Sequence, residues 1–469
     1  MTGVKRGAAR PRFRFATEST CNLPGKAGLI DSLPKEWRLP ETIDLLLLGA
    51  GQLITCRGAR KGPLRGRSLS DPGCVEDGAI AVTGGRISAI GTAAEVRAAL
   101  RGAEAARTID AGGRVVMPGW VDPHTHAVFA GYRADEYEAR IRGDNYLEIE
   151  KRGGGIKRSV REVREISEDK LFEISRRRLL RMLEQGVTTI EIKTGYGLDL
   201  DSEMKMLRVI ARLGRETPLD VVATFMGAHQ VPPGFAAGEY VDLIVKEMIP
   251  AVASSGLARF IDVFCEKGVF DVAGTRRILE AGKEYGFGLK LHADEIFSIG
   301  GTALAVELGA VSVDHLTMIT PGDMAALAGS GTVGVLLPST SFGLASRRFA
   351  PARDLVASGA AIALSTDFNP GSAPSSSMPL AVSIACSQMG LVPAEAINAA
   401  TYNAACAVGM EKETGSLEIG KKADIVVYDV ADYREIPSRA GLNHAAIVVK
   451  EGRVVWEAAD LRDRSEVGL

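Results

Sequence analysis

Eight short apolar segments alternate with segments of helical periodicity through the middle of this 469-residue chain. They are VVMPGWVDPHTH (115–126), GVTTIEIKTG (186–195), DVVATFMGAH (220–229), RFIDVFCEKG (259–268), GLKLHADE (288–295), AVSVDHL (310–316), TVGVLLPST (332–340) and AIALSTDFNP (361–370). Continuous apolar strands joined by helices imply parallel pairing with both faces buried. The pattern predicts an α/β fold, a (β/α)8 TIM barrel. The competing architecture, a doubly wound open sheet, usually carries a Gly-rich phosphate turn after its first strand, and this sequence has none.

Both ends of the chain have a different pattern. Residues 43–56 and 79–91 predict strands before the barrel, and residues 415–430 and 445–458 predict strands after it. Because chain termini often lie close together, we expect one small β-sandwich formed from both ends. The predicted domains are 43–114 and 415–469 for the two parts of the sandwich and 115–414 for the barrel. Residues 57–73 are polar and Gly-rich, which indicates a surface loop.

Composition narrows the class of protein. The net charge of −2 indicates neither nucleic acid nor an anionic membrane as a partner. The longest apolar runs fall well short of the roughly 18 residues of a membrane-spanning helix. Six cysteines without a CxxC motif predict reduced thiols. Residues 1–42 begin with a basic stretch that lacks the apolar core of a secretory signal, so we expect a disordered tail and a cytoplasmic protein.

Five of the six histidines fall at the carboxyl ends of the predicted barrel strands: His124, His126, His229, His292 and His315. Asp367 ends the eighth strand, and only His444 lies outside the barrel. Active sites of such barrels are built at the carboxyl ends of the strands. Five histidines at matching positions therefore predict one functional site rather than separate structural side chains.

The H-x-H spacing of His124 and His126 suits a metal ion, because residues two apart on a strand point to the same side. With His292 and Asp367 they form a set of N and O ligands suited to Zn²⁺ or Fe²⁺. A bound ion lowers the pKa of its water to about 7.

Three side chains are candidates for proton transfer. Asp367 can accept the proton of the water, and His315 can orient that water or share the role. Glu295 can pass a proton to a leaving or ring nitrogen, although a carboxylate at the start of a helix is its ordinary structural role.

Together these residues resemble the metal-dependent amidohydrolase superfamily over about residues 43–460. The likeness depends on PGWVDPHTHAVFAGYR, GDNYLEIEKRGGGI, TTIEIKTGYGLDL, TFMGAHQVPP, DVFCEKGVF, KLHADEI, LLPSTSF and STDFNPGSAP. That superfamily pairs a (β/α)8 barrel with a β-sandwich from both chain ends. The closer likeness is to the branch that hydrolyses 4-imidazolone-5-propanoate to N-formimidoyl-L-glutamate in histidine degradation, which implies the same reaction here.

The resemblance also implies residue roles. The metal ligands are expected to be His124, His126, His292 and Asp367. The substrate contacts are expected to be Arg133, Tyr196, His229, Glu295, Asn369, Gly371 and Ser372. An arginine fork suits the propanoate carboxylate of such a substrate, and the turn after Asp367 offers backbone N–H groups and an Asn amide to a polar ligand. The long polar segment 131–160 is expected to be a lid.

Three points stay open at this stage. The resemblance implies one divalent ion per chain, although Lys267 at the end of the fourth strand can in principle bridge a second. Another cyclic amidohydrolase or deaminase, such as a cytosine deaminase-like enzyme, is the nearest alternative, and a non-catalytic binding protein on the same fold is the other. The expected partner is a small-molecule substrate, and a homodimer is the assembly considered.

Overall fold

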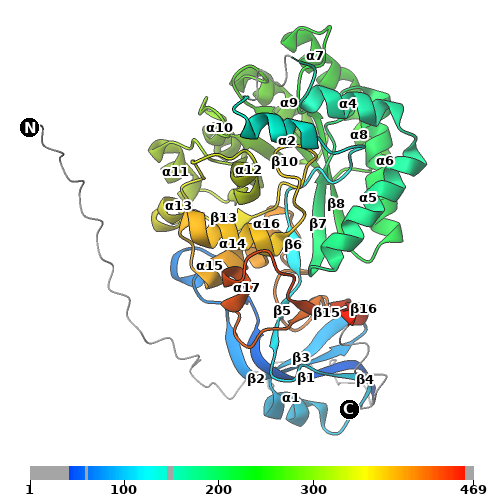
Figure 1. The fold of residues 1–469 in the computed structure, drawn as a ribbon, viewed down its shortest axis with the longest axis vertical. Coiled ribbons are helices and arrows are strands. Elements are labelled where there is room, and N and C mark those ends of the chain that lie inside the picture. Colours follow the sequence, from blue (N-terminus) through cyan, green and yellow to red (C-terminus); the bar gives the residue numbers. More distant parts are fainter. Residues whose placement is uncertain (1–41, 59–61, 145–151, 460–469) are drawn as a thin grey trace, which may run out of the picture.

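A computed structural model of the chain describes residues 42–58, 62–144 and 152–459. The predicted N-terminal tail lies outside these residues except for Thr42. The described part contains two β-sheets, a barrel ringed by helices and a smaller sheet below it (Figure 1).

The barrel strands pair in the order in which they occur along the chain, and every neighbouring pair is parallel. The strands are β6 (Trp120–Asp122), β7 (Val187–Lys193), β8 (Asp220–Ala228), β9 (Phe260–Cys265), β10 (Gly288–Ala293), β11 (Ser312–His315), β12 (Val333–Leu336) and β13 (Ile362–Leu364). A parallel bridge between Thr125 and Phe368 brings the two ends of this sheet together. The predicted (β/α)8 barrel is therefore confirmed, because a doubly wound sheet reverses its strand order.

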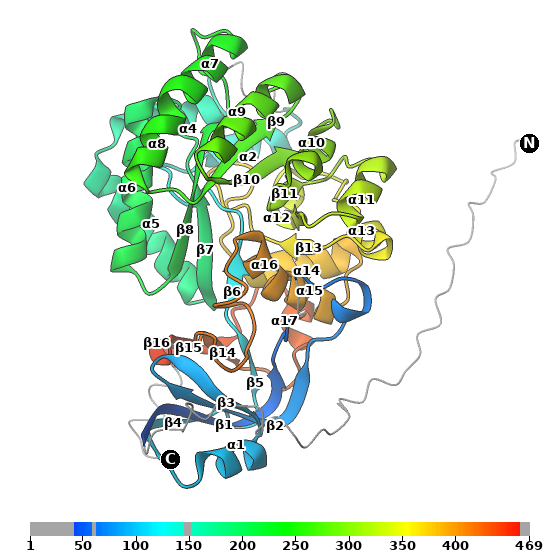
Figure 2. The ribbon, with the colours of Figure 1, turned by 180° about the vertical axis from the view of Figure 1, so that it is seen from behind.

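Helices follow the strands and surround the barrel (Figures 1 and 2). They are α2 (Ala134–Ile141), α4 (Ile156–Glu165), α5 (Glu168–Leu183), α6 (Leu200–Glu216), α7 (Ala237–Leu243), α8 (Ile249–Ser255), α9 (Val272–Glu284), α10 (Gly301–Leu308), α11 (Pro321–Ala328), α12 (Pro338–Gly343), α13 (Ala352–Ser358), α14 (Met378–Met389), α15 (Pro393–Ala399) and α16 (Tyr402–Ala407). Helices α5, α6 and α9 begin at side-chain caps from Ser167, Asp199 and Asp271, the residue types that satisfy free N–H groups. No helix of residues 42–58, 62–144 and 152–459 is long and apolar enough to cross a membrane.

The smaller sheet draws its strands from both chain ends. Its members are β1 (Thr42–Ile54), β2 (Cys74–Thr83), β3 (Arg86–Thr92), β4 (Glu104–Asp110), β5 (Val115–Pro118), β14 (Ile425–Tyr428), β15 (Ala445–Lys450) and β16 (Arg453–Glu457). Helix α1 (Ala93–Leu100) packs on the N-terminal strands, and α17 (Glu435–Ser438) connects β14 with β15. The antiparallel pair of β5 and β14 joins the two halves, and both strands are labelled at this junction in Figure 2. The predicted β domain from both chain ends is confirmed.

One predicted strand, residues 115–126, is wrong as a single element. It divides into β5 in the smaller sheet and β6 in the barrel, with Gly119 between them. A Cβ atom on Gly119 would lie 2.3 Å from the side chain of Thr188, so only glycine fits where the chain passes between the sheets. The domain boundaries at 115 and 414 stay a prediction.

Two predicted loops contain more structure than their polarity indicated. In 57–73, the Arg65 guanidinium donates hydrogen bonds to the carbonyls of Ala328, Ser330 and Gly359, which fastens this loop to the ends of α11 and α13. The predicted lid, 131–160, contains α2 and the start of α4, and its residues 145–151 lie outside the described residues.

The smaller sheet is joined to the barrel by a buried ion cluster. The Lys450 ammonium on β15 lies 2.9 Å from Asp424 and 2.9 Å from Asp220, the first residue of barrel strand β8. The Lys450 side chain is 5% exposed and that of Asp424 is 2% exposed. Because β5 leads directly into β6, the barrel strands run away from this junction, and their carboxyl ends lie on the opposite side of the barrel.

This junction generates a stability prediction. Lys450→Met leaves the Asp424 carboxylate buried without its partner, which should lower the free energy of unfolding by about 3 kcal/mol. The control is Lys422→Met, because Lys422 also binds Asp220 but is 18% exposed, and its loss should cost less than about 1 kcal/mol. Urea unfolding measures both, and equal losses would contradict the role of the buried pair.

Candidate metal centre and active site

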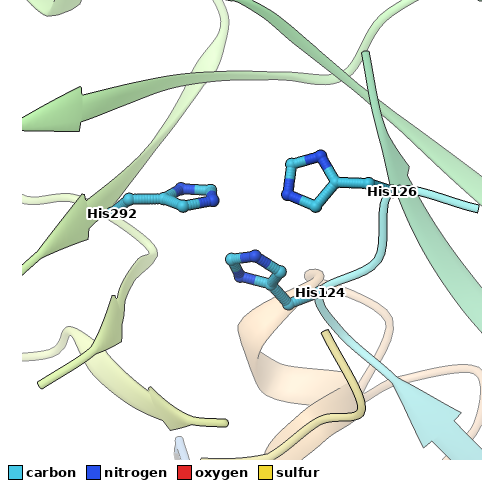
Figure 3. A group of neighbouring side chains, drawn as sticks. All are labelled: His124, His126 and His292. Atoms are coloured by element: carbon cyan, nitrogen blue, oxygen red, sulfur yellow. The ribbon is translucent and has the colours of Figure 1, made fainter. Parts of the chain in front are cut away.

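Three imidazole rings converge at the carboxyl end of the barrel (Figure 3). His124 and His126 follow β6, and His292 lies in β10. One ring nitrogen of each lies within 4.8 Å of the corresponding atoms of the other two. All three residues are at most 2% exposed, and burial lowers the pKa of His124 and His126 well below the usual range. Neutral rings with free lone pairs are the form that binds a metal ion.

Two buried carboxylates hold two of these rings. His124 Nδ1 lies 2.6 Å from Asp314, and His292 Nδ1 lies 2.9 Å from Asp262. The opposite nitrogens, Nε2 of His124 and of His292, are buried and have no hydrogen-bond partner. Buried polar atoms without a partner are costly, whereas a metal ion between them would satisfy both. The residues present therefore fit a divalent metal ion.

Asp367 completes this group from the segment after β13. Its Oδ1 lies 3.5 Å from His124 Nε2 and 3.9 Å from His126 Nε2, and its other oxygen accepts a hydrogen bond from Thr340. Burial raises the pKa of Asp367 to about 6. The backbone of Asp367 has a φ of +52°, an uncommon conformation for a non-glycine residue that concentrates at functional sites.

Glu295 and His315 lie beside the metal group. His315 Nε2 is 3.7 Å from the Glu295 carboxylate, and the His315 ring centre is 5.1 Å from that of His292. Burial, with the negative charges of Asp367 and Glu266, raises the pKa of Glu295 to about 8. Near neutral pH this carboxyl group can therefore carry a proton.

Tyr196 and His229 form one side of the site. The His229 ring stacks on His126 with centres 4.8 Å apart, and the Tyr196 ring lies 5.4 Å from His229. Burial and the neighbouring His292 lower the pKa of His229 to about 3. The loop that carries Tyr196 is held by the buried Glu203 carboxylate, which accepts three backbone N–H groups from residues 195–198.

Arg133 lies next to the turn that follows Asp367 and is only 5% exposed. Its Nη1 donates to Ser159, and its Nε lies 3.1 Å from Glu136. The guanidinium is packed against Gly371, where a Cβ atom would come within 1.8 Å of Nη2. A fixed, buried guanidinium at this position can bind a carboxylate.

The turn from Asn369 to Ser372 uses its own donors. The N–H groups of Gly371 and Ser372 donate to Asn369 Oδ1, and Asn369 Nδ2 donates to Ser372 Oγ and to the carbonyl of Asp367. These groups were predicted to bind a ligand, but in the structure they form the internal hydrogen bonds of an Asx-type turn. In this conformation the turn shapes the backbone between Asp367 and Arg133.

Lys267, the residue considered for bridging a second ion, is exposed. Its ammonium lies over the Phe297 ring, 5.0 Å from the ring centre. The three histidines, in contrast, are buried inside the barrel. Lys267 is therefore not part of the buried group that the histidines form.

The charged residues below the histidines were not among the site residues predicted from the sequence. Glu191, Lys193, Asp262, Lys290 and Asp314 are all 0% exposed. Their signal was present in the sequence, because a charged residue inside an otherwise apolar parallel strand is unusual. The spacing within each strand did not indicate that residues from β7, β9, β10 and β11 meet.

Comparisons with known proteins agree with this architecture. The sequence profile of the amidohydrolase family matches residues 115–455. The imidazolonepropionase of Symbiobacterium thermophilum is 49% identical over 425 residues, which cover 90% of this chain and 99% of that protein. The imidazolonepropionase of Geobacillus kaustophilus is 48% identical over 88% of this chain and 97% of its own length.

Solved structures share the fold at much lower identity. An adenosine deaminase from Xanthomonas campestris with bound zinc has a TM-score of 0.64 at 21% identity, over 92% of this chain and 98% of that one. Guanine deaminase from E. coli has a TM-score of 0.67 at 14% identity, over 88% and 99%. At these identities the likeness extends to the fold alone.

The geometry of the centre predicts which substitutions lose the metal ion. His124→Ala and Asp367→Ala should each reduce the bound metal at least tenfold from about one ion per chain, because each removes a donor atom. His444→Ala is the control, since His444 is buried outside the barrel. Elemental analysis after dialysis measures the content, and full metal in either site variant would contradict the assignment.

Proposed function

Because this chain belongs to the amidohydrolase family and, within it, to the imidazolonepropionases, we propose that it hydrolyses 4-imidazolone-5-propanoate to N-formimidoyl-L-glutamate in histidine degradation. It is a hydrolase that acts on a cyclic amide. The observation that carries the choice of substrate is the buried Arg133 guanidinium beside the turn after Asp367, because the propanoate arm supplies a carboxylate for it.

His124, His126, His292 and Asp367 would hold one divalent ion, Zn²⁺ or Fe²⁺, for which N and O donors are suited. When bound, such an ion lowers the pKa of a water toward neutrality. By holding the Nδ1 atoms of His124 and His292, Asp314 and Asp262 would leave the Nε2 atoms available to the ion.

Proton transfer would depend on three side chains. Asp367 lies against His124 and His126 and accepts the proton of the attacking water. His315 orients that water from the neighbouring strand end. Glu295 holds a proton near neutral pH because of its raised pKa, and it donates this proton to the ring nitrogen whose bond to carbon breaks.

The remaining residues would bind and orient the substrate. Arg133 binds the propanoate carboxylate, while Tyr196 and His229 contact the imidazolone ring. Asn369 holds Gly371 and Ser372 close to the substrate through the turn they share. Cytoplasmic location and a homodimer stay predictions.

The experiment that tests the reaction is direct incubation of the metal-loaded protein with 4-imidazolone-5-propanoate. Loss of the ring chromophore, with N-formimidoyl-L-glutamate identified by mass spectrometry and no ammonia released, supports the proposal. Release of ammonia would identify a deaminase instead. Absence of any turnover in metal-loaded protein would favour a binding protein.

Arg133 generates a prediction about substrate affinity. Arg133→Ala should raise KM about 10- to 100-fold with a smaller change in kcat, since a hydrogen bond to a charged group contributes about 1.5–3 kcal/mol. Gly371→Ala should raise KM as well, because its Cβ would displace the guanidinium.

Arg158→Ala is the matched control. Its guanidinium pairs with Asp135 and Glu162 at the protein surface, so KM should not change. An unchanged KM in Arg133→Ala, or equal effects in Arg133→Ala and Arg158→Ala, would argue against the carboxylate role.

Glu295 generates a prediction about pH. A carboxyl group with a raised pKa is protonated below that pKa and loses its proton as the pH rises through it. The pKa of Glu295 is raised to about 8, so kcat/KM should fall as the pH rises through that value. A bound metal ion favours the charged carboxylate, so the fall should occur at pH 8 or somewhat below it. The charged and titratable groups that face Glu295 are His315, Asp367 and Glu266.

Glu295→Gln should reduce kcat about 100-fold or more, and its residual activity should lack the alkaline decline. Rate measurements across pH check both statements. A variant that keeps the same alkaline decline would exclude Glu295 as its source.

A further inference from the structure

A layer of charged side chains fills the barrel directly below the three histidines. It consists of Glu191 and Lys193 on β7, Asp262 on β9, Lys290 on β10 and Asp314 on β11. All five are fully buried. Such barrels are usually filled with branched apolar side chains, and a buried charge costs several kcal/mol unless it is well paired. A charged layer in this place therefore calls for a functional explanation.

Lys193 is the member of this layer that reaches both carboxylates beneath the metal ligands. Its Nζ lies 2.7 Å from Asp262 Oδ2 and 3.4 Å from Asp314 Oδ2. Asp262 in turn holds the His292 ring, and Asp314 holds the His124 ring. The Lys193 ammonium group thus connects the two carboxylates that hold the His292 and His124 rings.

The surrounding carboxylates favour the charged form of Lys193. Burial opposes the ammonium form, but the negative charges of Asp262, Glu191 and Asp314 outweigh it and raise the pKa of Lys193. The third carboxylate, Glu191, lies 2.9 Å from Nζ. Asp262, His292 and Asp314 also form a group with the spacing to hold a cation, and the Lys193 ammonium lies within that group as a cation supplied by the chain itself.

Lys290 provides an internal comparison. It is equally buried and equally long, but its ammonium lies 3.1 Å from Glu191 and 3.1 Å from the carbonyl of Pro123. Neither contact is with a carboxylate that holds a metal ligand. Any effect of losing a buried lysine on the general stability of the barrel should therefore be seen in both lysines.

We propose that Lys193 is a positioning residue of the metal centre, which ties Asp262 to Asp314 and thereby aims His292 and His124 at a single ion. Without the ammonium, the two carboxylates repel each other, and the rings lose their fixed orientation. The inference depends on the metal site of the proposed function. It does not depend on which substrate is hydrolysed.

The test measures metal binding rather than turnover. The full chain and its Lys193→Met and Lys290→Met variants are stripped of metal and titrated with Co²⁺ in competition with a chromophoric chelator, and the visible Co²⁺ spectrum is recorded. Lys193→Met should weaken Co²⁺ binding about 10- to 100-fold and alter the spectrum. Lys290→Met should change the affinity less than about threefold, while the metal-free forms of both lose similar thermal stability. An affinity of Lys193→Met close to that of the unchanged chain, or equal losses in both variants, would overturn the proposal.

If Lys193→Met does not fold, a second set of variants tests the same proposal. Lys193→Gln keeps a polar hydrogen-bond donor without the charge, and Asp314→Asn removes the negative charge of the carboxylate that holds His124. Because Lys193 acts partly through Asp314, the double variant should lose less Co²⁺ affinity than the sum of the two single losses. Strict additivity would contradict the proposal. If the unchanged chain does not bind Co²⁺, the metal site itself is rejected. If it binds Co²⁺ but does not hydrolyse the imidazolone, only the proposed substrate is rejected.

Discussion

The pairing of two of the three buried imidazoles, His124 and His292, with buried carboxylates is the interaction on which the metal centre depends. A histidine ring can rotate and can carry its proton on either nitrogen, and only one arrangement presents a lone pair to an ion. Asp314 and Asp262 select that arrangement for His124 and His292. Their own charges are tolerable inside the barrel because Lys193 lies between them. The ligands, their supports and the cation below them thus form one continuous buried network.

The barrel supplies the geometry for this network. Parallel strands in sequence order bring their carboxyl ends to one face, where residues far apart in the chain meet.

Several of these strand ends turn sharply, with left-handed backbone at Asp294, His315 and Asp367. Such conformations cost of order 1–3 kcal/mol each and persist where the surrounding structure holds them. Here the N–H of Met318 donates to the carbonyl of Asp294, and Thr340 binds the side chain of Asp367.

Much of this arrangement could be predicted from the sequence because its signals are local. Strand and helix periodicity predicted the barrel, and the H-x-H spacing predicted that His124 and His126 share one side. The division at Gly119 was not predictable, because residues 115–126 are apolar throughout and the break depends on contact with Thr188. Nor was the charged layer, because Lys193 and Asp262 are 69 residues apart and meet only when β7 and β9 are placed around the same barrel. The hydrogen bonding of the turn after Asp367 was also not predictable, because its Asn, Gly and Ser residues can bind a ligand or form hydrogen bonds within the turn.

Anomalous X-ray diffraction from crystals of the metal-loaded protein, measured at the absorption edge of the bound metal, would locate the ion among these side chains. We expect one anomalous peak per chain, with nitrogens of His124, His126 and His292 and an oxygen of Asp367 at about 2.0–2.2 Å from it. Asp262 and Asp314 should lie behind the rings with the Lys193 ammonium between them. A second peak between Asp262 and Asp314, or a peak that one of the three histidines does not reach, would contradict this expectation.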